Sequence, residues 1–500
     1  MVIFRKVRAA KFPHGQQYAF YMELTERIDA LVREVEAKSP GALSYKGMNF
    51  MHAFEALLYF GTVLDAGLNT RFEARAGLCK AISPLERKLA GLMSEFWFAE
   101  RPRISERVLW QPKEALRGMR NALRRHLPGS RSHFAPDWAG DRPNVAFFVR
   151  SVRFARFFLP IARALSKSYV YLVPAAARAV QDWANQEQIP FAAIRPRRPS
   201  TLDMGEVLQT YAPDVAALAD GMEAILSRLR PRVVVVPEGN TPEDEILNQI
   251  GKKLGVPVVC LQHGWSPIPH PGFRNMSYAS MFVWGPRFAD LLAPFNPHQR
   301  FVSVGNHALP MHIARPAWER GSIVFFCQGW DNWLGGRRSG AMLLDLAEWF
   351  ATAHPLISVR VRPHPLDPLP NDRAARLTGL PNVTIDLPER TPIADSFADA
   401  RATVTVYSTT ILESVATGSI PLIFNSTTLP RYWPDVAEAG AAVEVKTFDE
   451  AKNALEKLAG DDELLRAMNP RLTDFAQRFF LCRGEEAIEN IVRELERFAC

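Results

Sequence analysis

The chain has 500 residues, of which 47% are hydrophobic and 23% are charged, and its formal net charge is +7. One hydrophobic core rarely serves so long a chain, so two or three domains are expected, and the composition excludes disorder on a large scale. Five scattered cysteines without a C-x-x-C pair favour a reduced, cytoplasmic protein. No uncharged apolar stretch reaches the length of about 18 residues that a membrane span needs, so neither a span nor a signal peptide is expected.

Residues 1–140 are predicted to be mainly helical, because apolar residues recur at helical spacing over Tyr21–Ala37 and Phe50–Leu64. The stretch from Arg101 to His133 holds nine Lys and Arg against two Glu, which equals the whole net charge. Such a patch suits anionic head groups on the inner face of the cytoplasmic membrane or a polyanionic acceptor, and a solvated helix face is the alternative. No basic motif interleaved with aromatic residues and no known nucleic-acid-binding signature accompanies the patch, so a nucleic-acid partner is not expected.

From residue 141 onward, short apolar strands alternate with helical segments, which is typical of βαβ units and a parallel sheet. Residues 141–312 are predicted to form one Rossmann-like domain, 313–480 a second, and 481–500 a C-terminal helix. The fold class is therefore α/β, with two Rossmann-like domains (GT-B architecture) and a helical N-terminal extension. The expected strands are Val145–Val149, Tyr169–Val173, Val233–Val236, Val256–Leu261, Met281–Trp284, Phe301–Val304, Ile323–Cys327, Ile357–Val361, Val383–Ile385, Thr403–Val406 and Pro421–Phe424, and the expected helices of the second domain include Ala341–Ala353 and Thr410–Thr417.

Two polar clusters follow strands of the first domain, where ligands of open parallel sheets bind. Glu238, followed by Gly239, comes directly after a run of four valines. His263 stands between Gln262 and Gly264, directly after the next strand. If consecutive strands are neighbours in the sheet, His263 lies at the same edge as Glu238. A carboxylate or an imidazole there can act as general base toward an acceptor hydroxyl. The alternatives are a solvated loop acid and a structural histidine.

The second domain has a strand followed by Arg362-Pro363-His364-Pro365. The two prolines exclude a helix and hold His364 in a rigid, extended loop. An arginine fork and an imidazole in this setting suit a pyrophosphate or a monophosphate leaving group. The alternative is a structural, proline-rich turn.

A cluster of hydroxyls links another strand to a helix: Ser408, Thr409 and Thr410, with Glu413 one turn further on. The start of a helix offers free N–H groups, so this segment is predicted to bind an anion, and Glu413 is positioned to reach ribose hydroxyls. The alternative is a capping box between Thr410 and Glu413.

Several familiar motifs are missing from the sequence. There is no D-x-D, so no metal ion is expected on the donor diphosphate, and cationic side chains take that role. The phosphate loop of ATPases, the G-x-G-x-x-G dinucleotide fingerprint and a serine nucleophile elbow are also absent, so neither an ATPase nor a nicotinamide enzyme is expected. No cofactor is predicted.

Between Pro237 and Leu309, the motifs E-G-N-T-P-E-D-E, L-Q-H-G, F-V-W-G and V-S-V-G-N resemble bacterial capsule and surface-polysaccharide biosynthesis proteins. The segments R-P-H-P and Y-S-T-T-I-L-E-S-V-A-T-G-S-I-P extend this resemblance into the second domain, so that it covers roughly residues 230–430.

Three motifs are similar to those of bacterial sialyltransferases and polysialyltransferases: an acidic pair before glycine, a His-Pro, and a Ser followed by Ser or Thr. Here they are Glu238-Gly239, His364-Pro365 and Ser408-Thr409, and Pro237 replaces the first acid of the pair. The resemblance implies that Glu238 is the general base and that His364 and the hydroxyls bind the donor's nucleotide phosphate. The Q-H-G, R-P-H-P and S-T-T motifs also resemble CDP-glycerol glycerophosphotransferases.

The resulting hypothesis is a metal-independent, inverting glycosyltransferase that uses a nucleotide-sugar donor and a saccharide or lipid-linked acceptor. Glu238 or His263 takes the acceptor proton, and the departing phosphate is held by Arg362, His364, Ser408 and Thr409. The alternatives are a CDP-glycerol-type glycerophosphotransferase, an isomerase like the nonhydrolysing UDP-N-acetylglucosamine 2-epimerases, and a non-catalytic polysaccharide-binding subunit.

Overall fold

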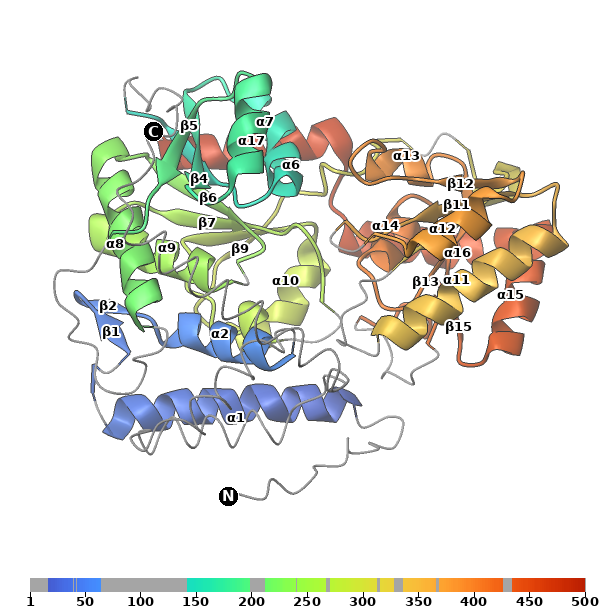
Figure 1. The fold of residues 1–500 in the computed structure, drawn as a ribbon, viewed down its shortest axis with the longest axis horizontal. Helices are drawn as coiled ribbons and strands as arrows, with labels where there is room; N and C mark the ends of the chain where they lie inside the picture. The colour runs from blue at the N-terminus through green and yellow to red at the C-terminus, as the bar shows by residue number, and fades with distance from the viewer. Residues whose placement is uncertain are drawn as a thin grey trace.

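The computed structural model describes residues 17–38, 40–41, 43–63, 142–197, 212–239, 241–266, 270–312, 315–327, 336–365, 368–425 and 434–499. Two α/β halves lie side by side, and the N-terminal elements lie against the first of them (Figure 1). The basic stretch 101–133 lies outside the described residues. Within the described part of the chain, no helix is long and apolar enough to cross a membrane.

The first half is built on a seven-stranded parallel sheet in the order β5-β4-β3-β6-β7-β8-β9. Its central strands are runs of Val, Phe and Leu that are buried along their whole length, as expected for a sheet covered by helices on both faces. The strands are β3 Val145–Phe148, β4 Tyr169–Pro174, β5 Phe191–Ile194, β6 Val233–Pro237, β7 Val258–Leu261, β8 Ser280–Val283 and β9 Phe301–Ser303, and the α-helices between them are α6 Val152–Ala164, α7 Arg178–Gln186, α8 Ala212–Leu229, α9 Pro242–Leu254 and α10 Pro286–Leu292.

The second half repeats this plan with a six-stranded parallel sheet in the order β12-β11-β10-β13-β14-β15. The strands are β10 Ser322–Phe326, β11 Ser358–Arg362, β12 Val383–Ile385, β13 Ala400–Thr405, β14 Ile420–Phe424 and β15 Val443–Val445, and the α-helices are α11 Gly336–Ala353, α12 Asn371–Thr378, α13 Ile393–Phe397, α14 Thr410–Ala416, α15 Phe448–Gly460 and α16 Asp462–Phe479.

Both sheets have the strand order of a doubly wound fold, which confirms the predicted pair of Rossmann-like domains. Two edge strands were not predicted. The first, β5, is the short segment Phe-Ala-Ala-Ile, and the second, β15, has three residues. Neither carries the run of branched apolar residues that marks the buried central strands. In each sheet, successive strands are added first on one side of the starting strand and then on the other. The strand order therefore reverses between β3 and β6 in the first sheet and between β10 and β13 in the second.

The N-terminal layer consists of α1 Gln17–Lys38, a hairpin of β1 Ser44–Tyr45 and β2 Met48–Asn49, and α2 Met51–Val63. Both helices were predicted, but the hairpin was not. Its two-residue turn, Lys46-Gly47, has positive φ at both positions, as the tightest hairpin turns require. The hairpin is anchored to α8, because Asp220 accepts hydrogen bonds from the Tyr45 hydroxyl at 3.0 Å and the Lys46 ammonium at 2.7 Å.

The two halves are joined by the chain that leaves α16. This segment crosses to the first half, where the Leu481 N–H donates to the carbonyl of Trp284 at 2.9 Å. It then continues into α17 Gly484–Ala499, whose Ile491 and Leu495 are buried in the core of the first sheet. The last helix therefore packs back onto the first half.

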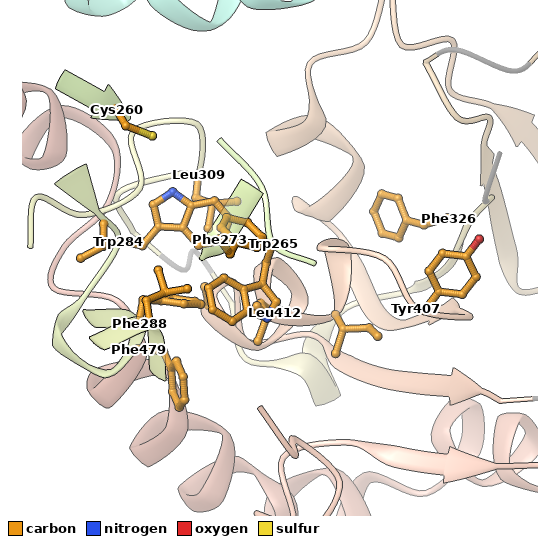
Figure 2. Close-up of a cluster of buried hydrophobic side chains, with 14 of the residues drawn as sticks. Cys260, Trp265, Phe273, Trp284, Phe288, Leu309, Phe326, Tyr407, Leu412 and Phe479 are labelled. Carbon is orange, nitrogen blue, oxygen red and sulfur yellow. The ribbon is translucent and has the colours of Figure 1, made fainter. Parts of the chain in front are cut away.

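An apolar cluster reinforces this joint (Figure 2). The Phe288 ring of α10 lies 4.8 Å from the Trp265 ring and 5.2 Å from the Phe479 ring at the end of α16. Trp284 stacks on Phe480 with ring centroids 5.5 Å apart. Aromatic pairs of this kind bury large areas, so the orientation of the two halves is stabilised by packing as well as by the connecting chain.

We expect Gly285→Ala to destabilise this joint. A Cβ atom at position 285 would lie 2.3 Å from the carbonyl oxygen of Phe479, and neither backbone can move without disturbing the crossing segment. The free energy of unfolding should fall by about 1–3 kcal/mol in urea titrations. Gly460→Ala is the matched control, because a Cβ there meets no atom within 4 Å. An unchanged midpoint for Gly285→Ala would show that the joint is looser than described.

Candidate active site

Glu238 stands at the carboxyl end of β6, at the reversal point of the first sheet. It has a φ of +63° and Gly239 has a φ of +67°. A left-handed conformation costs a non-glycine residue about 1–2 kcal/mol, and such strain concentrates at functional sites. Gly239 cannot be replaced without movement, because a Cβ there would lie 2.7 Å from the sulfur of Cys260. The tight turn therefore aims the Glu238 side chain away from the packed sheet.

His263 follows the neighbouring strand β7 and lies against Glu238, with Nδ1 3.1 Å from Oε1. The rings of Phe154 and Phe157 form its walls, at centroid distances of 5.0 and 4.5 Å. Gln262 is buried and holds the base of this loop, since its Oε1 accepts a hydrogen bond from the N–H of Trp284 at 2.9 Å. Gln262 thus supports the loop that carries His263.

Arg153, in the first turn of α6, is part of the site and was not predicted. Its Nη2 lies 2.8 Å from Nδ1 of His263 and 3.6 Å from Oε1 of Glu238, and its Nε lies 3.3 Å from Nε2 of His263. The signal was present, because Arg153 and Arg150 follow the strand that ends at Phe148. Both arginines therefore stand after a strand of the first sheet, as Glu238 and His263 do.

The two arginines have different surroundings. Arg150 donates to the Thr241 hydroxyl and lies 3.2 Å from Oδ2 of the buried Asp244, so it ties the end of β3 to the start of α9. The side chain of Arg153 is 37% exposed and makes no such structural link among the contacts described for it.

The protonation states of the first-sheet pair follow from burial and nearby charge. Burial by itself would raise the pKa of Glu238, but the hydrogen bond with His263 and the charges of Arg153 and Arg150 together hold that pKa well below its ordinary value. Burial, and after it the charge of Arg153, lowers the pKa of His263 to about 4. At neutral pH the site therefore holds a carboxylate beside a neutral imidazole.

Thr409 brings the second sheet to this pair. Its hydroxyl accepts a hydrogen bond from the N–H of Trp265 at 2.9 Å and donates one to the carbonyl of Trp265 at 3.0 Å. A Cβ built on Gly264 would lie 3.4 Å from both Thr409 Oγ1 and Glu238 Oε1, so these two oxygens lie within twice that distance of each other. Gly264 therefore lies where the two halves approach each other.

Two further predicted residues of the second half lie near the same gap. Burial, and after it the charge of Arg153, lowers the pKa of His364 to about 4. Burial raises the pKa of Glu413 to about 7, against the charges of Arg362 and Arg153. Arg153 contacts His263 and Glu238 of the first half, and Arg156, one turn further along α6, donates to the carbonyl of Glu389 in the second half at 2.8 Å, so this end of α6 lies at the junction of the two halves.

Other predicted residues are placed differently from the hypothesis. Arg362 is buried, and its Nη1 donates to the carbonyl of Thr391 at 2.9 Å and to the Ser396 hydroxyl at 3.1 Å. Its guanidinium thus supports the 391–396 segment instead of forming an open fork. The alternative capping box is wrong, because α14 begins at Thr410 with Ser408 Oγ accepting from the N–H of Thr410 at 3.2 Å.

No family model and no curated protein matches the chain. Among solved structures it is similar to the S. aureus MnaA–UDP co-structure, with a TM-score of 0.49 and 13% identity over 71% of this chain and 96% of that chain. It is also similar to the UDP-GlcNAc 2-epimerase from Neisseria meningitidis bound to UDP-GlcNAc, with a TM-score of 0.48 and 15% identity over 71% and 99% of the two chains. The spinosyn rhamnosyltransferase SpnG complexed with spinosyn aglycone gives 0.46 and 18% over 71% and 100%.

We expect Glu413→Gln to change how stability depends on pH. The pKa of this carboxyl is 4.5 in the unfolded chain and about 7 in the folded chain. Folding therefore disfavours its ionisation, and stability falls as pH rises between these values. Removing the charge should raise the melting temperature by a few degrees at about pH 8 and change it little near pH 4. Calorimetry beside the exposed-site variant Glu489→Gln checks this, and an equal shift at both pH values would contradict it.

Proposed function

We propose that this protein is a glycosyltransferase that moves a sugar from a nucleotide-sugar donor to a saccharide or lipid-linked acceptor of a bacterial surface polysaccharide. The observation that carries the proposal is the meeting of the two sheet edges. The Glu238–His263 pair lies at one edge and Thr409 at the other, with Trp265 hydrogen-bonded to Thr409 between them. Ligands of doubly wound sheets bind at such reversal points, so a donor bound to one half would face an acceptor bound to the other.

In the proposed reaction, His263 takes the proton of the acceptor hydroxyl. The hydroxyl oxygen attacks the anomeric carbon of the donor, the bond from that carbon to the phosphate oxygen breaks, and the electron pair leaves with the phosphate. A single direct attack inverts the configuration at the anomeric carbon. Glu238, with its pKa held low, is a weak base and acts instead by holding the imidazole and stabilising its protonated form.

The second half would bind the donor. The hydroxyl of Ser408 and the imidazole of His364 would contact the phosphates, and Glu413 the ribose hydroxyls. Thr409, predicted to bind the phosphate as well, donates its one O–H to Trp265 and so positions the loop instead. Arg153 supplies a cation at the junction, where a guanidinium can form two parallel hydrogen bonds to phosphate oxygens. The proposed transfer needs no metal ion. The proposal places the protein at the cytoplasmic face of the membrane, and the basic stretch 101–133 supports that location from the sequence only.

We expect one of CMP, CDP, UDP or GDP to stabilise the protein against heat. A nucleotide at about 100 times its dissociation constant adds roughly 2.7 kcal/mol to the free energy of unfolding. The Ser408→Ala variant should lose most of this gain, because it lacks a hydroxyl at the proposed phosphate site. If none of the four nucleotides shifts the melting temperature, the chain is better described as a non-catalytic polysaccharide-binding subunit.

We expect His263→Asn and Glu238→Gln to lower the rate of sugar transfer by about 10²- to 10⁴-fold while nucleotide binding persists, because His263 takes the acceptor proton and Glu238 stabilises the protonated imidazole. Glu489→Gln, an amide substitution on the exposed face of α17, is the matched control. Excess EDTA should leave the wild-type rate unchanged. Conversion of a nucleotide sugar without any acceptor would instead indicate an isomerase, and transfer of glycerol phosphate from CDP-glycerol a glycerophosphotransferase.

A further inference from the structure

The base proposed above is covered by Arg153 in this structure. The guanidinium lies along the imidazole of His263, with Nη2 2.8 Å from Nδ1 and Nε 3.3 Å from Nε2. Glu238 approaches the same Nδ1 at 3.1 Å. An acceptor hydroxyl cannot reach a ring nitrogen of His263 that Arg153 already occupies.

These three contacts cannot all be hydrogen bonds. A neutral imidazole offers one N–H donor and one acceptor nitrogen, whereas Arg153 presents N–H groups to both nitrogens and the Glu238 carboxylate requires an N–H at Nδ1. If Nδ1 donates to Glu238, the Nη2 group of Arg153 has no acceptor there. If Nδ1 accepts from Arg153, the carboxylate loses its donor. Arg153 and Glu238 therefore compete for one nitrogen of His263.

Arg153 is also free to be drawn away. Its ion pair with Glu238 is long, at 3.6 Å, and more than a third of its side chain is exposed. Arg150, one turn earlier, is held by Thr241 and Asp244. A phosphate offers a guanidinium two parallel, charge-assisted hydrogen bonds, which are stronger than contacts with a neutral imidazole. A phosphate at the junction of the two halves would thus compete well for Arg153.

We propose that Arg153 is a phosphate-responsive cover on His263: it blocks the imidazole until a diphosphate binds in the gap, and its move to the phosphate leaves Nδ1–H to Glu238 and exposes Nε2 as the base. Arg153 is a positioning residue toward His263 and a ligand toward the phosphate. The assignment of that phosphate to a sugar donor rests on the proposed function. The device prevents the base from acting before the donor is in place.

The charged and titratable groups that face His263 are Glu238 from the end of β6, Arg153 and Arg150 from the β3–α6 connection, and His307 after β9. His307 is neutral, because burial lowers its pKa to about 4. Arg153 is the strongest of the charges that lower the pKa of His263, after burial itself. Loss or neutralisation of this one cation should therefore raise the pKa of His263.

The test uses inorganic pyrophosphate as the probe and the full-length protein carrying carbon-13 histidine, with the His263 signal assigned through His263→Asn. In the wild type, pyrophosphate should raise the pKa of His263 by about one unit or more. In Arg153→Gln the pKa should already be raised, pyrophosphate should change it no further, and calorimetric binding of pyrophosphate should weaken at least about tenfold. Arg153→Lys, which keeps the charge without the fork, should bind at an intermediate strength, and Arg163→Gln in the last turn of α6 should behave as wild type.

Two results would contradict the proposal that Arg153 covers His263. The first is unchanged pyrophosphate binding in Arg153→Gln, and the second is a wild-type His263 signal that does not respond to bound pyrophosphate. Both leave the proposed sugar transfer standing. Conversely, pyrophosphate could change the pKa of His263 through Arg153 in a protein that transfers no sugar from any nucleotide sugar. That result would support the cover and contradict the proposed function. Once a donor is known, kcat/KM can be measured against pH, and its acidic limb should move to higher pH in Arg153→Gln.

Discussion

The arrangement of the site depends on one hydroxyl. Thr409 Oγ1 satisfies both backbone groups of Trp265, accepting from its N–H and donating to its carbonyl, as a neighbouring strand would. The loop after β7 is thereby attached to the loop after β13, although the two belong to different sheets. Without this contact, the strained turn at Glu238 and the phosphate-side loops would face each other across an undefined distance. The apolar cluster around Phe288 and the crossing chain after α16 prevent the halves from turning about this contact.

Burial sets the charge state on each side of the gap, and the arginines then modify it. Glu238 is kept ionised by its neighbours although it is largely buried, whereas Glu413 is pushed by burial toward its protonated form. Burial keeps His263 and His364 neutral. A site with one fixed anion and neutral imidazoles suits a reaction in which one proton is removed and one anion departs.

Arg150 and Arg153 show how the environment separates residues of one type. They are three positions apart at the start of the same helix, yet one is locked to the start of α9 and the other lies over a histidine at the junction of the halves. Arg362 is a further example, in which a residue predicted to bind a ligand has a structural role. In the sequence it looks like a phosphate ligand, but its guanidinium is used to support the 391–396 segment.

Much of the fold could be read from the sequence. Runs of branched apolar residues with polar residues after them identified the central strands and their carboxyl ends, because such strands are buried on both faces and leave their chemistry at one edge. Glu238, His263 and Thr409 were found by this rule. The edge strands β5 and β15 were missed because edge strands need less apolar surface. The sequence could not show that Arg362 turns inward, that Arg153 covers His263 or that Thr409 bonds to Trp265. Each of these depends on the distance between segments far apart in the chain, which only the packing of the two sheets determines.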